Sequence, residues 1–586
     1  MNINFNLDNP ENELSLTGKK IAGLSISRLI LFFSLIAVVI VGLTEIRWLL
    51  LLFFPLSILF IYLIKRFNIL KDRQAFLKAV IQIKEDEKLR KSRKLDSFDQ
   101  GQDFIDKKHP FSNDLDLFGE HSLFQLLNHT VSKEGRARLA KEMKTLVPIA
   151  TAEKKFYAIK ELSSKWDFLL HFEAFGKAFL KDEKPKLAFY EWMKTGYQWK
   201  KGFYLPLVIG PIAGLIVLSA VLFGYISPAF LSAWLLLSLF ALSFVFKPLI
   251  AAAKSMPNEG DVKTFTAWAI QMENIEFKDP YLQDLQKPIF EKDFRASVSL
   301  KTLEQQSFAV QNRANLVYLI FNFLFWVDFI VLLKLEKWKR KNKSHIHLWQ
   351  QCFDEWQVMV SLGAFEKEEK ITTPVQWTEK PILQVKALRH PLLNPLSCVP
   401  NDFTLTQEEK IVLLTGSNMS GKTTFMRTVG INMVLVNMGL SPFADEYVSG
   451  EFQLFTSMRN TDSLGESVSS FYAELARIKG LLDQAEKDKP MFFLLDEILK
   501  GTNTTDRIMG SEALIRQLTE SLSKGIISTH DIELADLGMQ GVVNYSFHSD
   551  IKDNEILFDY TLKKGACPSF NAHKLMELMG IKFRND

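Results

Sequence analysis

Residues 411–424 read Ile411-Val412-Leu413-Leu414-Thr415-Gly416-Ser417-Asn418-Met419-Ser420-Gly421-Lys422-Thr423-Thr424. The four apolar residues at the start predict a buried strand, and the residues after them fit the Walker A pattern G-x-x-x-x-G-K-[ST]. The two glycines of this pattern permit the backbone to turn several N–H groups inward, which makes a nest for an anion. A helix that opens at Gly421 aims its positive end at the same place. The stretch therefore predicts a nucleotide-binding loop; the alternative is a strand–helix turn that binds nothing.

Lys422 and Thr423 are the chemically active side chains of this loop. We expect Lys422 to reach the β- and γ-phosphates of ATP, and the Thr423 hydroxyl to ligate Mg²⁺. A second apolar run, Met491–Leu495, predicts a strand whose end carries Asp496 and Glu497. Asp496 is placed to hold the Mg²⁺ shell, and Glu497 to orient the attacking water or take its proton. The alternative is an ordinary strand end that carries two acids.

A third strand is predicted over Gly525–Thr529, and it ends at His530. A side chain at that position can sense the γ-phosphate and relay its presence to the rest of the protein. A lone histidine is usually structural or solvated, and only its place after a strand in this domain favours the sensing role.

The overall composition excludes little. The chain has 586 residues, enough for about three or four domains. Its formal net charge is +4, from 71 Lys and Arg against 67 Asp and Glu, so charge alone gives no argument for a nucleic-acid partner. Cys352, Cys398 and Cys567 are widely spaced and form no metal or redox pattern, which favours a reducing compartment.

Two pairs of apolar runs predict transmembrane helical hairpins. They are Leu29–Leu43 with Trp48–Ile64, and Phe203–Phe223 with Ala229–Phe246. Each run of the first pair is near the lower length limit for crossing a bilayer. Lysines and arginines flank both pairs, so the positive-inside rule puts the ends of both hairpins in the cytoplasm. We expect a multi-pass protein of the cell inner (cytoplasmic) membrane, with no cleaved signal peptide. Buried core helices are the alternative.

The stretch Leu316–Leu333 is also apolar, but it carries Asn322 and Asp328. A carboxylate near the bilayer centre costs at least about 2.5–3.5 kcal/mol on insertion scales. One unpaired crossing would also put the nucleotide loop outside the cell. We therefore expect a buried helix of a soluble domain. Two basic runs, residues 88–94 and 334–343, suit a solvated helix face or cytoplasmic anchors, and they would also suit a phosphate backbone.

The motifs around the expected site resemble those of the MutS mismatch-repair ATPase family. Residues 415–424 resemble its T-G-P-N-M-G-G-K-S-T, with Ser420 in place of a glycine. Residues 494–506 are similar to its L-L-D-E-x-x-x-G-T-S-T-x-D, and residues 529–534 to its T-H-Y-H-E-L. Residues 469–475, which read Ser469-Ser470-Phe471-Tyr472-Ala473-Glu474-Leu475, look like its S-T-F-x-x-E-[ML] signature.

Two further segments resemble the start of that family's ATPase domain: Arg389-His390-Pro391 and Val399-Pro400-Asn401-Asp402. The order and spacing of five motifs match, so the resemblance is specific across residues 385–586. A weaker resemblance to the family's helical core extends over residues 110–375.

The resemblance implies a P-loop ATPase domain of the ABC and MutS kind, with a mostly parallel sheet, preceded by an all-α core and lever. It implies ATP and Mg²⁺ as cofactors and a homodimer in which two ATPase domains sandwich ATP. Ser469 or Ser470 of one subunit would then reach the γ-phosphate bound by the other. An N-cap serine of a helix is the alternative, and both roles are compatible. Mismatch recognition does not carry over, because the mismatch-reading and connector domains have no room before the first predicted span.

The predicted domains follow from these assignments. They are a polar segment 1–25, hairpin 26–66, helical core 67–200, hairpin 203–247, helical core and lever 250–375, and ATPase domain 380–586. Three functions stay open. The first is a membrane-anchored MutS-like ATPase that does mechanical work, with DNA as an open partner. The second is an ATP-driven transporter, and the third is a scaffold with a vestigial site.

Overall fold

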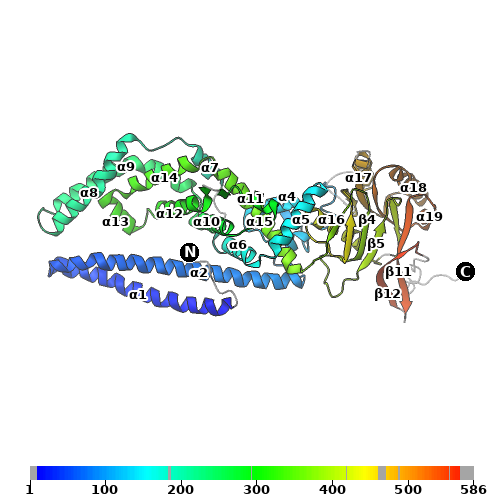
Figure 1. Ribbon diagram of the computed structural model, residues 1–586, viewed down its shortest axis with the longest axis horizontal. Coiled ribbons are helices and arrows are strands. Elements are labelled where there is room, and N and C mark those ends of the chain that lie inside the picture. Colours follow the sequence, from blue (N-terminus) through cyan, green and yellow to red (C-terminus); the bar gives the residue numbers. More distant parts are fainter. Residues whose placement is uncertain are drawn as a thin grey trace. The chain divides into compact units, whose positions relative to one another are not determined.

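A computed structural model describes residues 9–181, 186–291, 294–417, 419–459, 470–485, 489–552 and 555–567. The chain forms two compact units. Unit 1 comprises residues 1–86, 130–135 and 166–360, and unit 2 comprises residues 87–129, 136–165 and 361–586. Figure 1 shows helices through the first two thirds of the chain and strands mixed with helices in the last third. The predicted order, a helical region followed by an α/β region, is confirmed.

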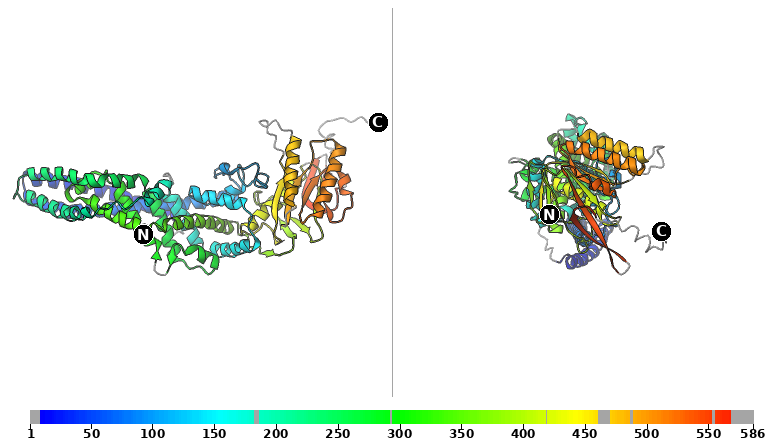
Figure 2. Two further views of the ribbon diagram at one scale, coloured as in Figure 1. Left: turned by 90° about the horizontal axis from the view of Figure 1, so that it is seen from above. Right: turned by 90° about the vertical axis from the view of Figure 1, so that its right-hand side faces the viewer.

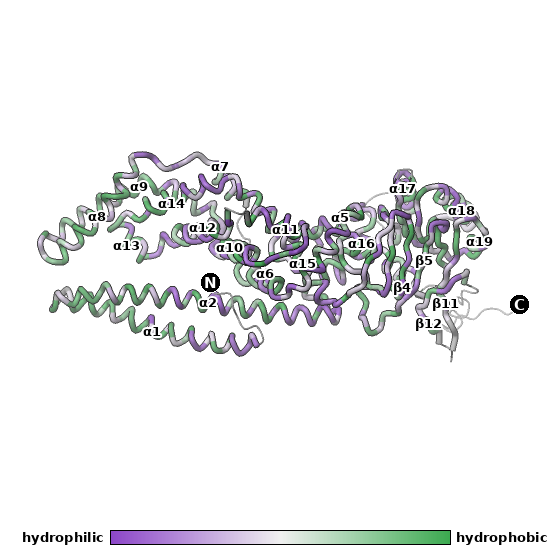
Figure 3. The backbone as a smooth tube through the Cα atoms, in the orientation of Figure 1, coloured by the Kyte–Doolittle hydropathy of each residue, from purple (hydrophilic) through white to green (hydrophobic). Residues whose placement is uncertain are grey.

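Long apolar helices dominate unit 1. The first two are α1 (Pro10–Thr44) and α2 (Phe53–Lys91), joined by the short helix η1 (Arg47–Leu52); the next two are α8 (Tyr204–Leu222), which follows η3 (Lys201–Phe203), and α9 (Ala229–Ser255). All four are long and apolar enough to cross a membrane by length and composition, and at most 22% of the apolar window of each is buried. Figure 3 shows the apolar residues gathered in α8, α9 and the parts of α1 and α2 near their connection. The four predicted apolar runs fall within these helices.

Shorter helices complete unit 1 and the helical part of unit 2. They are α3 (Leu123–Leu127), α4 (Lys133–Lys144), α5 (Ile149–Ser163), α6 (Trp166–Phe179), α7 (Lys186–Lys194), α10 (Glu259–Asn274), α11 (Pro280–Gln286), α12 (Ala296–Gln311) and α15 (Ile346–Glu369), with η2 (Gln102–Phe104) and the strands β1 (Phe290–Glu291) and β2 (Phe294–Arg295). Aromatic packing holds the core of unit 1: the Phe172 and Trp268 rings stack at 4.3 Å, and the Trp268 indole donates to the Phe172 carbonyl at 2.7 Å.

The prediction for Leu316–Leu333 is wrong in two respects. The stretch forms two helices, α13 (Leu316–Phe325) and α14 (Val327–Asn342), bent by 94° at Trp326. The second half is buried as expected, but α13 exposes most of its apolar side chains. The bend arises because Trp326 adopts a left-handed backbone (φ +52°), which ends the first helix.

The basic run at residues 88–94 is also corrected, because two of its arginines are buried rather than solvated. Arg93 forms a bidentate pair with Glu369 at 2.7 and 2.9 Å, and Arg90 donates to the Asn128 carbonyl at 2.8 Å. All of these residues belong to unit 2. The two guanidinium groups join separate segments of that unit by hydrogen bonds and an ion pair. They are not available to a phosphate backbone.

Two sheets form the α/β part of unit 2. The six-stranded sheet has the order β12-β11-β6-β10-β9-β8, and the smaller sheet has the order β3-β7-β4-β5. In the larger sheet, among the described residues, every pairing is parallel except that of β11 with β12. The bounds are β3 (Val375–Trp377), β4 (Leu383–Leu388), β5 (Asn401–Leu405), β6 (Ile411–Thr415), β7 (Glu446–Ser449), β8 (Gln453–Ser457), β9 (Met491–Asp496), β10 (Lys524–Thr529), β11 (Val542–Lys552) and β12 (Glu555–Lys564).

Helices cover both faces of the larger sheet (Figure 2). One face packs against α17 (Ser470–Ala485), α18 (Thr504–Glu520) and α19 (Ile532–Ala535), with Leu481, Ile515 and Phe493 in its core. The other face packs against α16 (Lys422–Asn437), where the backbone at Gly430 lies close to Leu494. Strands buried on both faces read as continuous apolar runs, which is why β6 and β9 were recognisable from sequence. The carboxyl ends of β6, β9 and β10 lie at one edge of the sheet.

Candidate functional site

The loop between β6 and α16 has the geometry of an anion cradle. Gly416 (φ +148°) and Gly421 (φ +105°) both have backbone angles that favour glycine. A Cβ atom at Gly416 would also lie 2.7 Å from the Phe547 carbonyl oxygen, so no larger residue fits there. Gly421 is the N-cap of α16, which begins at Lys422. The unpaired N–H groups at the start of α16 therefore face the loop.

Lys422 lies inside this loop. Its side chain is buried, and its ammonium donates to the carbonyls of Gly416 at 2.8 Å and Ser417 at 3.1 Å. Burial lowers the pKa of Lys422, and the nearby carboxylates of Glu497 and Asp496 act in the opposite direction. A positive charge is thus held at the centre of the cradle, where it can pair with phosphate oxygens.

The two side chains predicted to hold Mg²⁺ are in contact. The Thr423 hydroxyl donates to one carboxylate oxygen of Asp496 at 2.6 Å, and the Ser528 hydroxyl donates to the other. Ser528 is the direct neighbour of Asp496 in the parallel pairing of β10 with β9. Among the residues that the structure describes, no cluster of three or more His, Cys, Asp or Glu could hold a metal. Mg²⁺ suits this donor set, because it is usually bound by one or two protein ligands together with phosphates and water.

Glu497 is held in place by His530 and Lys500. Its carboxylate contacts the His530 ring nitrogen at 3.0 Å and forms an ion pair with Lys500. Burial raises the pKa of Glu497, but the hydrogen bonds and charges of His530 and Lys500 outweigh it and lower the pKa to about 2. This pairing stabilises the fold above the usual pKa of 4.5, and the contribution is lost as the pH falls from there toward 2. Glu497 is therefore ionised at neutral pH.

The backbone of Glu497 adds a further restraint. Its φ is +52°, which is uncommon for a residue other than glycine. The N–H of Glu497 donates at 3.1 Å to both the carbonyl and the hydroxyl of Ser528. The end of β10 therefore fixes the direction in which the Glu497 side chain leaves β9. Strained backbone at such a position is typical of functional sites.

The signature motif lies only partly within the described residues. Ser469 lies outside them, and Ser470 is described only as the first residue of α17. Asn418 of the phosphate loop also lies outside the described residues. Further along α17, the Glu474 carboxylate accepts a hydrogen bond from the Leu499 N–H, and Phe471 packs against Gly501. Helix α17 therefore contacts the loop that follows Glu497 in the same chain.

A cleft of about 420 Å³ opens beside the cradle. Ser417, Met419, Ser420 and Thr424 line it together with Lys422, Thr423 and Glu497. The hydroxyl oxygens of Ser417 and Ser420 are buried and have no hydrogen-bond partner among the described residues. Since such oxygens are normally paired, they fit a ligand with polar groups in the cleft.

The other wall of this cleft is mainly apolar and was not predicted as part of the site. Its residues come from the end of β4, from the β4–β5 connection and from the β11–β12 ribbon: Leu388, His390, Leu393, Val399, Phe547 and Tyr560. Burial lowers the pKa of His390 to about 4, so this ring is neutral. A neutral, apolar wall opposite a charged cradle suits a ligand with a flat base at one end and phosphates at the other.

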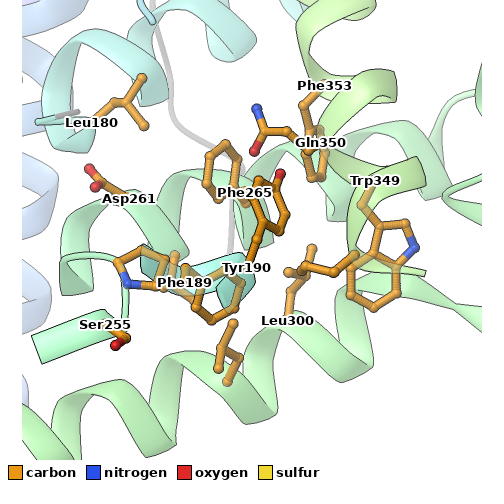
Figure 4. Close-up of a pocket in the computed structure, with 14 residues that line it drawn as sticks. Leu180, Phe189, Tyr190, Ser255, Asp261, Phe265, Leu300, Trp349, Gln350 and Phe353 are labelled. Atoms are coloured by element: carbon orange, nitrogen blue, oxygen red, sulfur yellow. The ribbon is translucent and has the colours of Figure 1, made fainter. Parts of the chain in front are cut away.

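Unit 1 contains a second cavity, shown in Figure 4, with a volume of about 50 Å³. Aromatic side chains from α7, α10 and α15 surround it, including Tyr190, Phe265 and Trp349. Its size leaves room for a few water-sized molecules. The cleft at the phosphate loop is therefore the better candidate for the functional site.

Sequence comparisons find relatives for the region that contains the phosphate loop. Residues 412–581 match the family model MutS domain V. The DNA mismatch repair protein MutS of Aquifex pyrophilus is 32% identical over 199 residues, which cover 33% of this chain and 23% of that protein. The protein of the same name from Listeria monocytogenes serotype 4b is 33% identical over 200 residues, with the same two shares.

A third relative, the DNA mismatch repair protein MutS of Carboxydothermus hydrogenoformans, is 31% identical over 238 residues, which cover 38% of this chain and 27% of that protein. The chain thus spans about a quarter of the length of the curated relatives that it matches. These matches support the MutS family for the part of the chain that carries the phosphate loop.

Proposed function

We propose that this protein is a membrane-anchored ATPase of the MutS type, which binds and hydrolyses ATP with Mg²⁺ at the site built around the phosphate loop. The observation that carries this proposal is the contact of Thr423 with Asp496 beside a buried Lys422. Lys422 and Thr423 come from the start of α16, and Asp496 comes from the end of β9.

Each side chain has a role in this proposal. Lys422 and the first N–H groups of α16 bind the phosphates. Thr423 and Asp496 hold Mg²⁺, which neutralises phosphate charge when it is bound. Glu497 accepts the proton of the water that attacks the γ-phosphorus, and the bond to the β-phosphate oxygen breaks to leave ADP. His530 and Lys500 keep Glu497 ionised and oriented; a γ-phosphate-sensing role for His530 is part of the same proposal.

We further propose that the active form is a homodimer in which the signature serine acts on the partner's site. The match of residues 412–581 to MutS domain V supports this. Within one chain, the contacts of Glu474 and Phe471 connect the signature helix to the loop after Glu497. Helices α2 and α15 each contribute residues to both units, which supports transmission of the nucleotide state to the helical region.

Mixed dimers test this proposal. Glu497→Gln inactivates a subunit's own site, and the double change Ser469→Ala with Ser470→Ala inactivates its partner's site. Each variant alone is expected to be inactive. A mixture of equal amounts is expected to recover about a quarter of the wild-type rate, because random pairing puts half of the subunits in mixed dimers with one intact site each. The measurement is phosphate release from detergent-solubilised protein. A mixture as inactive as its two components would show that the serine does not act in trans.

The proposed anchoring puts two helical hairpins in the inner membrane, with the N-terminus and the ATPase domain in the cytoplasm. The four long apolar helices and their exposed side chains support it. The basic residues at the ends of both hairpins support the cytoplasmic side.

DNA is a proposed partner, since the matched relatives are named DNA mismatch repair proteins. The exposed basic residues on α14 are the candidate contacts: Lys334, Lys337, Arg340 and Lys341. If they contact phosphates, the affinity for duplex, branched or single-stranded DNA is expected to fall at least about tenfold between 50 and 200 mM salt. Fluorescence anisotropy with labelled DNA measures this, with Lys337→Glu as the weakened variant and Lys386→Glu, which lies on β4, as its control. If DNA does not bind, or if its binding does not change with salt, the proposal that DNA is a partner is wrong.

A further inference from the structure

Helix α13 is too short to cross a membrane, yet it exposes apolar side chains as the four long helices of unit 1 do. Five large apolar residues on it are open: Leu316, Val317, Leu319, Ile320 and Phe321, with exposed fractions from 36% to 72%. Figure 3 shows α13 as an apolar segment beside α8. Such a continuous exposed patch on one short helix marks a surface that meets an apolar partner.

The opposite side of α13 docks closely on the second hairpin. Gly210 and Gly214 lie one turn apart on α8, and a Cβ atom at Gly214 would stand 1.8 Å from the Leu324 carbonyl oxygen. The Trp234 indole of α9 donates to that same carbonyl at 3.1 Å. The Trp326 indole donates to the Ser238 hydroxyl of α9 at 2.8 Å. The Leu324 carbonyl near the end of α13 is thereby satisfied by protein, as a lipid environment requires.

The two polar residues that argued against a membrane location are neutralised inside the protein. Asp328 is 1% exposed, and Arg313 donates to its two oxygens at 3.0 and 2.5 Å. The Tyr318 hydroxyl adds a hydrogen bond at 2.7 Å, and the Asn322 side chain accepts from the Asp328 N–H at 2.8 Å. None of these groups faces outward, so the charge does not oppose insertion of the apolar face.

The length and course of the segment decide how it would sit in a bilayer. Helix α13 has ten residues, and its length of about 15 Å is half of a hydrocarbon core of about 30 Å. The chain then bends by 94° into α14, which packs on α12, the helix that precedes α13. The segment therefore returns toward the side from which it came. The exposed basic residues Arg340 and Lys341 in the last turn of α14 favour the cytoplasm for that side.

We propose that α13 is a re-entrant half-helix, which enters the cytoplasmic leaflet beside α8 and α9, turns at Trp326 and leaves on the same side. Its partner is the acyl chains of the bilayer, which cover the face from Leu316 to Phe321. This inference rests on the proposed anchoring by α8 and α9, and it adds a third membrane element to the two hairpins.

Spin labelling of the full-length protein in proteoliposomes tests the lipid contact. Single cysteines are introduced as Ile320→Cys on α13, Leu236→Cys on α9 and Leu396→Cys in the β4–β5 connection. The unchanged chain, with its three native cysteines, gives the background. The accessibility of each label to oxygen and to a water-soluble nickel complex is measured. The label at 320 is expected to match that at 236, with oxygen favoured, whereas the label at 396 favours the nickel complex.

Each other outcome overturns the proposal in a distinguishable way. If position 320 is water-exposed while 236 is in lipid, α13 is not a membrane element but the anchoring stands. If both are water-exposed, the anchoring itself fails. If position 320 is closed to both reagents while 236 is in lipid, protein covers α13, such as a second copy of the chain.

The return to the same side has its own test. Asn315→Cys precedes α13, and Ser344→Cys follows α14. In sealed vesicles that expose the nucleotide domain, both cysteines are expected to react with a membrane-impermeant maleimide, as Leu396→Cys does. Reaction of Asn315→Cys and Ser344→Cys from opposite sides would show that the segment crosses the membrane.

Discussion

Replacing Glu497 by glutamine is expected to lower the rate of ATP hydrolysis by about 10²–10⁴-fold while ATP still binds. Glutamine has nearly the same shape, so it leaves the cleft intact, but its amide does not accept a proton. The carboxylate of the wild type is ionised at neutral pH, since its pKa lies far below 7. Phosphate release measures hydrolysis, and retention of labelled ATP on the purified protein measures binding.

The matched control is Glu520→Gln at the exposed end of α18, which is expected to leave both quantities unchanged. A Glu497→Gln protein that hydrolyses ATP at the wild-type rate would exclude Glu497 as the base. A variant that neither binds nor hydrolyses would instead point to a structural role of the ion pair with Lys500.

Replacing Lys422 by alanine is expected to weaken ATP binding by about 10²–10³-fold, because it removes the buried positive charge from the cradle. Hydrolysis at fixed ATP should fall with it. Titration of a fluorescent ATP analogue against the purified variant measures the affinity. The two variants therefore separate binding from chemistry, since Glu497→Gln keeps the nucleotide and Lys422→Ala loses it.

Lys386→Ala is the control for this change, because Lys386 is exposed on β4 in the same unit and pairs only at the surface with Glu446. It is expected to bind ATP as the wild type does. If Lys422→Ala and the wild type bound ATP with equal affinity, phosphates would not enter the loop. The proposed function would then be wrong.

The phosphate loop and its two acids were predictable because their signals are local. A fully buried strand, two glycines and a helix start follow one another within residues 411–424, and no distant contact is needed to recognise them. Ser528 was missed for the opposite reason. Ser528 contacts Asp496 only because of the parallel register of β10 with β9. The sequence of neither strand determines that register by itself. Lys500 lies only three residues after Glu497, but a single lysine in a loop carries no pattern that marks it as a partner.

The apolar wall of the cleft shows the same limit. Tyr560 and Phe547 belong to a ribbon far along the chain from Gly416, and only the folded sheet brings them together. Arg93 was misjudged because a charged run looks the same whether water or Glu369 neutralises it. At α13, the length of the apolar run was clear from the sequence. The bend was not predicted, because the left-handed residue there is Trp326 and not a glycine.

The position of the Lys422 ammonium has a consequence for which molecules the loop admits. Before any ligand arrives, the ammonium already has two acceptors, the carbonyls of Gly416 and Ser417. A ligand must compete with these neutral oxygens for the ammonium, and an anionic oxygen is a stronger acceptor than either of them. A molecule without negative charge offers no such gain, so the cradle discriminates by charge before the cleft discriminates by shape.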